Sequence, residues 1–316
     1  MARLPGQMNS PEPAPLPRRL VVGTRGSPLA RAQTNEALTP LRLVVPTIEI
    51  DVHIIRTAGD RDRRMPLAVI GGTGVFVKEI ERALLAGAID LAVHSLKDLP
   101  PRLEPGLALL AVPVRADPRD ALVSRDGLTL ERMPPGSRIG TGSARRRALL
   151  LRARPDVEVV DVRGNVETRI ARVRDGTIDA VVLAAAGLSR LGRLSEASEI
   201  LPTEIMLPSP GQGALGIEGR LDDPFAHEVA VLLDDPVAHA CVNAERAFLD
   251  RLGSGCASPV AAFARALDGT IEVRAMIASV DGSSAHEAAV RGLAGDAPAL
   301  GVQLAVELMG AAFGRG

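Results

Sequence analysis

The sequence predicts an α/β protein with two related α/β domains and a small C-terminal α+β domain. A length of 316 residues exceeds a single ordinary core of about 100–150 residues, and 46% of the chain is hydrophobic, enough to bury several cores. A glycine turn and a Gly-x-Ile-Asp segment each occur twice in the same order, which is typical of two related units. Beyond residue 213 this pattern gives way to strands joined by Asp-Gly turns.

The first unit alternates strands with helices. A helix is expected to begin at Pro28, because Ser27 is a favoured N-cap and proline at the first helical position loses no hydrogen bond. Gly87 is expected to end a later helix, which follows a glycine loop and carries an apolar stripe of Phe76, Ile80, Ala83 and Leu84. Apolar runs predict strands at 19–24, 48–55 and 89–94. The last strand runs out into 95–101, which therefore lies at its carboxyl end.

The second unit repeats this order of elements. The turn at 140–143 corresponds to the turn at 23–27, since each follows a strand-like run and opens a helix. The segment 176–182 corresponds to 87–93, and a further strand is expected at 157–162. The two landmarks lie farther apart in the first copy, so the repeat is loose. A coincidence of short Gly-Thr and Ile-Asp pairs is the competing explanation.

The last part of the chain predicts a small α+β domain. Residues 236–252 have the pattern of a helix, and Gly253 is a natural end for it. Strands are expected at 260–266 and 271–280, joined by Asp268-Gly269, a strong hairpin signal. A second Asp-Gly pair at 281–282 indicates a third strand, and a closing helix is expected at 297–313.

Composition excludes several classes of protein. The net charge of −1 argues against a nucleic-acid partner, because binding a phosphate backbone usually requires a basic domain or patch. No stretch reaches the ~18 charge-free apolar residues expected of a membrane span. The proline-rich first seventeen residues contain no signal-peptide core and have the composition of a disordered segment, so a cytoplasmic location is expected.

The two cysteines, Cys241 and Cys256, form no disulfide framework and no metal-like cluster, so no metal is expected. Cys241 lies in a helical run and is expected to be a small core residue. Cys256 lies in a loop of small residues at 253–259, where its sulfur would be accessible. A cysteine thiol is already appreciably nucleophilic near neutral pH, with an ordinary pKa of ~8.5.

Arginine dominates the basic residues: only Lys78 and Lys97 among the 37 are lysines. Arginine pairs with carboxylates and phosphates through two parallel hydrogen bonds, although a genomic composition bias also explains such an excess. Ligands of open α/β sheets lie beyond the carboxyl ends of the strands, where helix N-termini add a positive dipole end. Arginines flank these ends in both units, at Arg25, Arg145, Arg146, Arg163 and Arg169.

These arginines predict an exposed anion crevice between the two units. No Walker-type glycine loop is present, so a ligand with several carboxylates fits better than a nucleotide. Arg147, Arg172 and Arg174 are expected only to solvate the surface. Asp98, beside Lys97 at a strand end, could move protons or stabilise a cation, but a bare Lys-Asp pair is commonplace. His94 is expected to be a hydrogen-bonded core histidine, and no hydrolase triad is recognisable.

From residue 19 onward the chain resembles the hydroxymethylbilane synthase (porphobilinogen deaminase) family. The resemblance rests on five ordered motifs, GGTGVFVKE at 71–79, AVHSLKDLP at 92–100, DPRDA at 117–121, RGNVETR at 163–169 and PGQGA at 210–214. It implies a transferase of tetrapyrrole biosynthesis that joins porphobilinogen molecules head to tail, releases ammonia at each step and finally hydrolyses the product free as hydroxymethylbilane. It also implies a dipyrromethane cofactor, attached by a thioether to the loop cysteine that corresponds to Cys256.

The resemblance assigns roles to individual residues. Asp98 matches the catalytic aspartate, which would hold pyrrole N–H groups and offset a cationic azafulvene. Cofactor contacts are implied for Lys97, Arg145, Arg146, Ser143, Thr141 and Asp60. Contacts with the substrate, whose pyrroles carry acetate and propionate groups, are implied for Arg25, Ser27, Arg163, Arg169, Arg190, Phe76 and Gln212.

The resemblance also implies an architecture of two periplasmic-binding-protein-like α/β domains and a third domain with the cofactor loop. We expect a disordered extension at 1–18, a first domain at 19–113 with 214–231, a second at 118–208 and a third at 236–316. A monomer is expected, with the small molecule porphobilinogen as partner and neither nucleic acid nor membrane.

Two features depart from the family pattern. Many members carry lysines where this chain has Thr73 and Val69, so anion contacts there are either missing or supplied by Arg63 or Arg64. Two other interpretations are a carboxylate-binding protein of the same fold without catalysis, and an inactive paralogue. The absence of a secretion signal and the presence of a cysteine-bearing third domain argue against the first. The intact Asp98 and Cys256 argue against the second.

Overall fold

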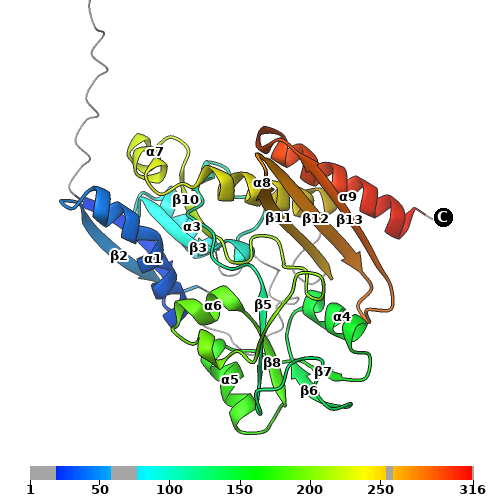
Figure 1. Cartoon of the computed structure of the whole chain (residues 1–316). Helices are drawn as coiled ribbons and strands as arrows, with labels where there is room; N and C mark the ends of the chain where they lie inside the picture. Colours follow the sequence, from blue (N-terminus) through cyan, green and yellow to red (C-terminus); the bar gives the residue numbers. More distant parts are fainter. Residues whose placement is uncertain (1–18, 58–76, 254–258, 315–316) are drawn as a thin grey trace, which may run out of the picture.

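The computed structural model describes residues 19–57, 77–253 and 259–314. Figure 1 shows two α/β units, one mainly blue to cyan and one mainly green, and a C-terminal unit coloured from yellow to red. In these residues the strands form two five-stranded mixed sheets and one three-stranded antiparallel sheet. No helix in the described ranges combines the length and the apolar character that crossing a membrane requires.

The first sheet has the strand order β2-β1-β3-β10-β4. Its strands are β1 (Arg19–Arg25), β2 (Glu49–Ile55), β3 (Leu91–Ser95), β4 (Leu107–Ala111) and β10 (Leu215–Arg220). The helices of this unit are α1 (Pro28–Val44), α3 (Lys78–Leu85) and α7 (Pro224–Val231). Leu20 and Val22 of β1 pack with Leu38 and Leu41 of α1 in a fully buried cluster. Alternate residues of a strand point to one face, so β1 presents an apolar face to this helix.

The second sheet has the strand order β7-β6-β8-β5-β9. Its strands are β5 (Asp120–Ser124), β6 (Arg138–Gly140), β7 (Glu158–Val160), β8 (Ala180–Ala184) and β9 (Glu199–Leu201). The helices of this unit are α4 (Ala144–Ala153), α5 (Val166–Arg174) and α6 (Ala185–Arg190). Separate buried clusters cover the two faces, one with Leu150 of α4 and one with Ile170 of α5. β5 and β8 lie between them and are almost continuously apolar.

The two sheets repeat one pattern. In the first sheet β1 pairs in parallel with β2 and β3, and a fourth strand, β10, pairs antiparallel with β3. In the second sheet β6 pairs in parallel with β7 and β8, and a fourth strand, β5, pairs antiparallel with β8. That fourth strand enters from the other unit: β5 follows β4, and β10 follows β9. The predicted pair of related α/β units is therefore confirmed. The chain crosses between the units twice, through residues 112–119 and 202–214, which we call the crossing segments.

The C-terminal unit packs α8 (Pro236–Leu252) and α9 (Ala297–Phe313) against a sheet of β11 (Val260–Leu267), β12 (Thr270–Ala278) and β13 (Ala285–Gly292). α8 ends at Gly253, whose positive φ of 62° is the left-handed conformation that glycine adopts readily. The β11–β12 hairpin closes at Asp268 and Gly269, with φ of 47° and 76°. The predicted helices and strands of this unit are confirmed, although β12 ends at Ala278 rather than residue 280.

A buried carboxylate of α8 joins the crossing segments to the C-terminal unit. Glu245 is fully buried and accepts hydrogen bonds from Arg115 in the first crossing segment, at 2.6 and 3.1 Å. It also accepts the backbone N–H of Gly211 in the second segment at 2.6 Å and that of Ala264 in β11 at 2.7 Å. The Arg115 guanidinium lies over the Phe263 ring, 5.2 Å from its centroid. Both crossings are thereby held to the helix that precedes the cysteine-bearing loop.

Candidate active site

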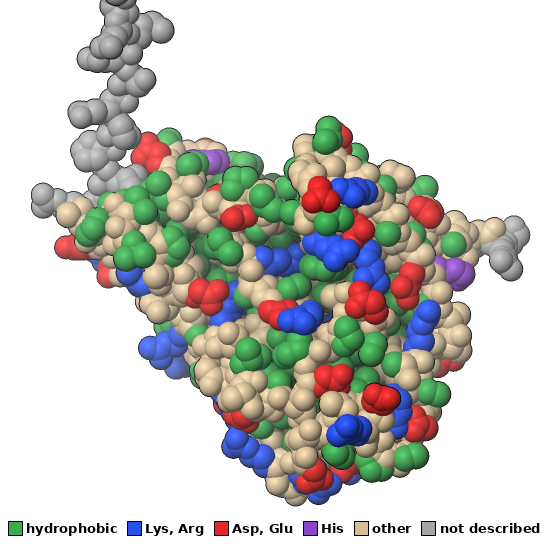
Figure 2. Space-filling model, in the orientation of Figure 1, with side chains coloured by type: hydrophobic (Ala, Val, Ile, Leu, Met, Phe, Trp, Pro, Cys, Tyr) green, Lys and Arg blue, Asp and Glu red, His purple; other side chains and the backbone are tan. Residues whose placement is uncertain are grey.

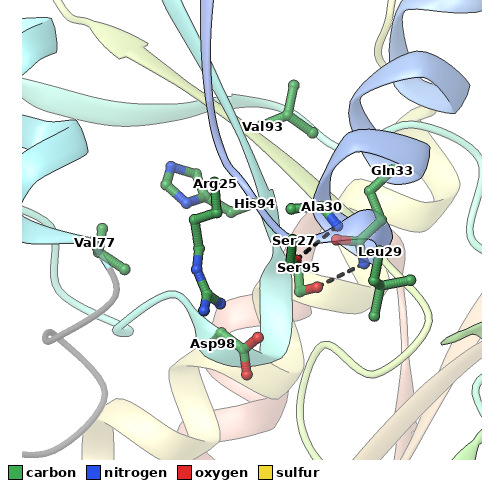
Figure 3. A pocket seen from close by; sticks show the side chains of 10 residues that line it. All are labelled: Arg25, Ser27, Leu29, Ala30, Gln33, Val77, Val93, His94, Ser95 and Asp98. Atoms are coloured by element: carbon green, nitrogen blue, oxygen red, sulfur yellow. Dashed lines mark hydrogen bonds between the residues drawn. The ribbon is translucent and has the colours of Figure 1, made fainter. Parts of the chain in front are cut away.

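A cavity lies at the carboxyl ends of β1 and β3, beside the N-terminus of α1 (Figure 3). Its polar side chains come from β1, α1, β3 and the turn after β3, and they face one another across a small space. Figure 3 shows the Arg25 guanidinium pointing toward the Asp98 carboxylate, with the His94 ring beside the Arg25 stem. The lining residues are Arg25, Ser27, Leu29, Ala30, Gln33, Val77, Val93, His94, Ser95 and Asp98. The cavity thus occupies the position where ligands of open α/β sheets bind.

Local sequence positions the first wall of this cavity. The Ser27 Oγ accepts the backbone N–H of Ala30 at 3.1 Å and caps α1, with Pro28 in the first turn as predicted. This capping places the positive dipole end of α1 at the cavity. The Gln33 amide donates to the Ser95 hydroxyl at 2.6 Å, which ties α1 to the end of β3.

Lys97 and Asp98 form a short 3₁₀ turn immediately after β3. The segment that follows this turn is bound to α8, because Arg246 donates to the carbonyl oxygens of Pro100 and Pro101 at 2.8 and 2.9 Å. Gly211 approaches the turn so closely that a Cβ at position 211 would lie 3.0 Å from the backbone nitrogen of Lys97. Burial and the nearby Arg146 guanidinium lower the pKa of Lys97 to about 8.

Arg145 and Arg146 lie in the second unit and share one carboxylate, that of Asp120. Asp120 is fully buried at the start of β5 and accepts from Arg145 at 2.7 Å and from Arg146 at 2.6 and 3.1 Å. Gln212 of the second crossing segment donates to the same carboxylate at 2.9 Å. Burial alone would raise the pKa of Asp120, but the charges and hydrogen bonds of the two arginines hold it at about 2.

This arrangement corrects the expectation of an exposed crevice at Arg145 and Arg146. Both side chains are buried, at 3% and 6% exposure, because each is fixed by Asp120 and by a backbone carbonyl. Sequence reasoning missed Asp120 as their partner. It lies in the DPRDA motif, but a carboxylate within a motif does not reveal which cation it pairs with across 25 residues.

The other predicted residues of the second unit surround this cluster. The Ser143 Oγ caps α4 by accepting from the backbone N–H of Arg146, and Thr141 accepts from that of Ser143. Burial and the Arg146 charge lower the pKa of Arg169 to about 10, while the charge of Asp98 acts in the opposite direction. Arg169 therefore lies within electrostatic range of both units. Arg163 is exposed and pairs with exposed Asp161 at 3.1 Å.

Arg190 spans the two α/β units. Its side chain is 5% exposed and donates to both carboxylate oxygens of Glu36 on α1 at 2.9 Å. It also donates to the Gly213 carbonyl oxygen at 3.0 Å. The residue expected to receive a substrate carboxylate thus holds a protein carboxylate in this structure.

Several predicted site residues lie outside the described residues. They are Asp60, Phe76 and Cys256, together with the departures Thr73 and Val69 and the neighbouring Arg63 and Arg64. Cys241, by contrast, is buried in α8 as expected, and burial raises the pKa of its thiol to about 11. That shift keeps the Cys241 sulfur protonated and poorly nucleophilic near neutral pH.

The charges of the described residues suit a group with several carboxylates. The charge of Arg146 lowers the pKa of Lys97 and that of Arg169, so these cations lie close enough to repel it. Within the described ranges, the buried Nε of Arg145 has no hydrogen-bond partner. Such an unsatisfied buried donor is costly and is typically satisfied by a ligand or ordered water. Figure 2 shows basic side chains gathered near the centre of one face of the molecule.

Comparisons with known proteins identify the family. The model described as porphobilinogen deaminase, dipyromethane cofactor binding domain, matches residues 20–228, and that of the C-terminal domain of porphobilinogen deaminase matches 239–310. The chain is 46% identical over 295 residues to porphobilinogen deaminase of Trichlorobacter lovleyi, covering 93% of this chain and 94% of that one. It is 47% identical over 290 residues to the enzyme of Roseiflexus sp., covering 92% and 95%.

Solved structures with similar folds are more distant. The substrate-binding domain 2 of Lactococcus lactis GlnP has a TM-score of 0.43 and 12% identity, and the match covers 70% of this chain and 90% of that one. The Escherichia coli sulphonate-binding protein SsuA has a TM-score of 0.38 and 16% identity, with coverage of 75% and 70%. The two family models together span both α/β units and most of the C-terminal unit. The chain therefore belongs to the porphobilinogen deaminase family.

Proposed function

We propose that this chain condenses porphobilinogen stepwise on a covalent dipyrromethane attached to Cys256, with Asp98 as the catalytic carboxylate. As a porphobilinogen deaminase it is a transferase of tetrapyrrole biosynthesis that releases ammonia and yields hydroxymethylbilane. The observation that carries the residue assignment is that Asp98 lines a cavity of the first unit. It also lies within electrostatic range of Arg169, which forms a basic cluster with Arg145 and Arg146 in the second unit. A reaction that moves carboxylate-bearing pyrroles past a cationic step needs both features.

The basic side chains would hold the carboxylates of the bound pyrroles. Arg25 and Ser27 serve the first unit, and Arg145, Arg146 and Arg169 serve the second. When bound, the dipyrromethane supplies the pyrrole carbon to which the first substrate is joined. Lys97, with its pKa near 8, carries its positive charge at neutral pH and loses it as the pH rises above that value. Attraction for the carboxylates should weaken over the same pH range.

Asp98 would stabilise the incoming substrate while ammonia leaves it. Departure of ammonia turns the aminomethyl pyrrole into a cationic azafulvene, and a fixed carboxylate beside it offsets that charge. The half-buried position of Asp98 limits screening by water, so the attraction is stronger than on an open surface. Its carboxylate would also accept hydrogen bonds from the pyrrole N–H groups.

We also propose a cytoplasmic monomer that needs no nucleic acid, membrane or metal. A reducing compartment keeps the attachment thiol free for thioether formation, which supports the cytoplasm.

The test is the intact mass of the purified protein and of two cysteine variants. Wild type and Cys241→Ser should carry the added mass of one dipyrromethane, because Cys241 is buried within α8. Cys256→Ser should lack it. Retention of the adduct by Cys256→Ser would exclude this attachment site, and a wild-type protein that binds porphobilinogen reversibly without any adduct would favour a carboxylate-binding protein.

A further inference from the structure

A histidine in the cavity wall is held by a buried carboxylate of the neighbouring strand. His94 is the fourth residue of β3, its ring lines the cavity, and it is 6% exposed. Its Nε2 lies 2.9 Å from the Oε2 of Glu218, which is fully buried in the neighbouring strand β10. Figure 3 shows the ring on the same side of the strand as Arg25 and above Asp98. His94 thus contacts a buried carboxylate and also lines the ligand cavity.

Among the described residues, His94 is the hydrogen-bond partner of the Glu218 carboxylate. In the described part of the chain its second oxygen, Oε1, has no hydrogen-bond partner. The charged groups that face this carboxylate are His94 on β3, Glu81 on α3 and Arg246 on α8, with Glu104 acting on Glu81. Burial and the charge of Glu218 raise the pKa of Glu81.

The arrangement fixes which nitrogen of His94 carries hydrogen. A Glu218 carboxylate in its ionised form can only accept, so it selects the tautomer in which Nε2–H donates and the lone pair lies on Nδ1. A buried carboxylate in this position orients the ring and stabilises the imidazolium that forms when Nδ1 takes a proton. A core histidine that only fills space needs neither the cavity nor an anion at full burial.

We propose that His94, oriented by Glu218, is the base that accepts the proton released from the pyrrole carbon at each condensation. His94 is the proton acceptor, and Glu218 is a positioning residue that acts through it. This inference rests on the proposed function, since the proton exists only if porphobilinogen units are joined here.

The proton arises from the bonding changes of the reaction. The C–N bond of the aminomethyl group breaks, and ammonia leaves with the electron pair. A carbon–carbon bond then forms from the α-carbon of the pyrrole at the chain end to the cationic methylene carbon. That α-carbon must lose its hydrogen as a proton, and the electron pair of the C–H bond restores the aromatic ring. His94 Nδ1 takes the proton and passes it to the departing ammonia or to water, which returns the site to its starting state.

A separate base leaves Asp98 free for its own role. A carboxylate that takes the proton loses the charge with which it offsets the cation, and it must be deprotonated before the next substrate arrives. An imidazole can accept a proton and later release it without neutralising the aspartate. Two groups therefore divide charge stabilisation and proton transfer between them.

The experiment compares His94→Gln and Glu218→Gln with His239→Gln. His239 is a matched control, because its Nδ1 contacts the Asp234 carboxylate at 2.8 Å but it lies on α8 outside the cavity. His94→Gln should lower kcat by at least ~10²-fold, the usual contribution of a general base. Glu218→Gln keeps the shape but loses the charge and should lower kcat by at least ~10-fold, as loss of an orienting carboxylate does. KM should change little in either variant, and His239→Gln should match wild type.

An isotope effect separates a proton-transfer role from a structural one. With porphobilinogen deuterated at its free α-carbon, His94→Gln and Glu218→Gln should show a larger isotope effect on kcat than wild type, because proton removal has become slow. Unchanged kcat in His94→Gln, or a fall in kcat without a larger isotope effect, would overturn the inference. If His94→Gln fails to fold by circular dichroism, Glu218→Gln decides by the same two readouts. A wild-type protein without covalent adduct or product would instead contradict the proposed function.

Discussion

Two aspartates lie near the basic cluster, and their surroundings give them different roles. Asp120 is fully buried, its oxygens accept from Arg145, Arg146 and Gln212, and its pKa is held at about 2. It is therefore a permanent anion that neutralises part of the cluster. Asp98 is half-buried at the edge of the cavity, where a ligand can reach it. Its charge is available to a cation that appears during the reaction.

Replacing Asp98 should separate charge from shape. Asp98→Asn keeps the size and one acceptor but loses the charge, so kcat should fall by at least ~10²-fold, the scale of one preorganised stabilising group. Asp98→Glu keeps the charge but displaces it by one methylene, so it should retain more activity than Asp98→Asn. The measurement is steady-state formation of hydroxymethylbilane, with circular dichroism as the control for folding. Near-native turnover by Asp98→Asn would contradict its catalytic role.

Replacing Asp120 should destabilise the second unit. Asp120→Asn leaves two buried guanidinium groups without their anion, which typically costs about 3–5 kcal/mol of unfolding free energy. The control Asp117→Asn breaks a partly exposed pair with Arg119 and should cost less than about 1 kcal/mol. Because the folded pKa of Asp120 lies below its ordinary value of 3.8, its stabilisation is present above pH ~4 and is lost as the pH falls through 2. Urea unfolding at pH 7 and pH 3 measures both effects, and equal losses in the two variants would refute the assignment.

At the scale of the helix and strand, local signals in the sequence carried most of the information. Ser27, Ser143 and Asn165 each cap a helix through the side-chain oxygen, and each follows a strand in a short turn. These caps are local, so the repeat of strand, turn and helix could be predicted without knowing the fold. The partners of Arg190 and Glu218 could not, because they lie 154 and 124 residues away in the chain. Sequence spacing contains no information on contacts of that range.

The close approach of the two crossing segments depends on glycine. Gly213 has a φ of 85°, and a Cβ there would lie 2.5 Å from the Ala116 carbonyl oxygen of the other segment. Gly213→Ala should therefore cost more than the about 1–2 kcal/mol expected for left-handed backbone alone. Gly136→Ala is the control, because Gly136 has a similar φ of 78° and open space around it. Thermal unfolding should show a larger fall in Tm for Gly213→Ala, and equal falls would indicate that the segments separate without cost.

At the scale of the whole molecule, the site depends on how the units are held together. The crossing segments meet at Gly213, Glu245 joins both to the helix before the cysteine-bearing loop, and Gln212 reaches Asp120 in the second unit. The position of α8 and the position of the arginines are thus connected by a few buried contacts. The family resemblance implied the architecture and the chemistry, but these contacts are visible only in the structure. The residue assignments and the domain boundaries stay predictions.

Arg190 has two roles to reconcile: the proposed role as a substrate receptor, and the observed contact between α6 and α1. Its hydrogen bonds to Glu36 use Nε and Nη2, so one edge of the guanidinium is held by that carboxylate. If this contact only joins the units, Arg190→Gln and Glu36→Gln remove the same interaction and should have equal effects.

We expect unequal effects, because Arg190→Gln removes the charge that would bind a substrate carboxylate, whereas Glu36→Gln leaves that charge in place. Arg190→Gln should lower kcat/KM at least ~10-fold, the equivalent of one charge-assisted hydrogen bond of about 1.5–3 kcal/mol. Glu36→Gln, which leaves the guanidinium charged, should change kcat/KM less than ~3-fold, since Glu36 is 43% exposed and such pairs contribute little. Steady-state kinetics measures both variants, and small-angle X-ray scattering reports whether either one opens the two units. Equal losses in kcat/KM, accompanied by the same increase in molecular dimensions, would assign Arg190 to the junction alone.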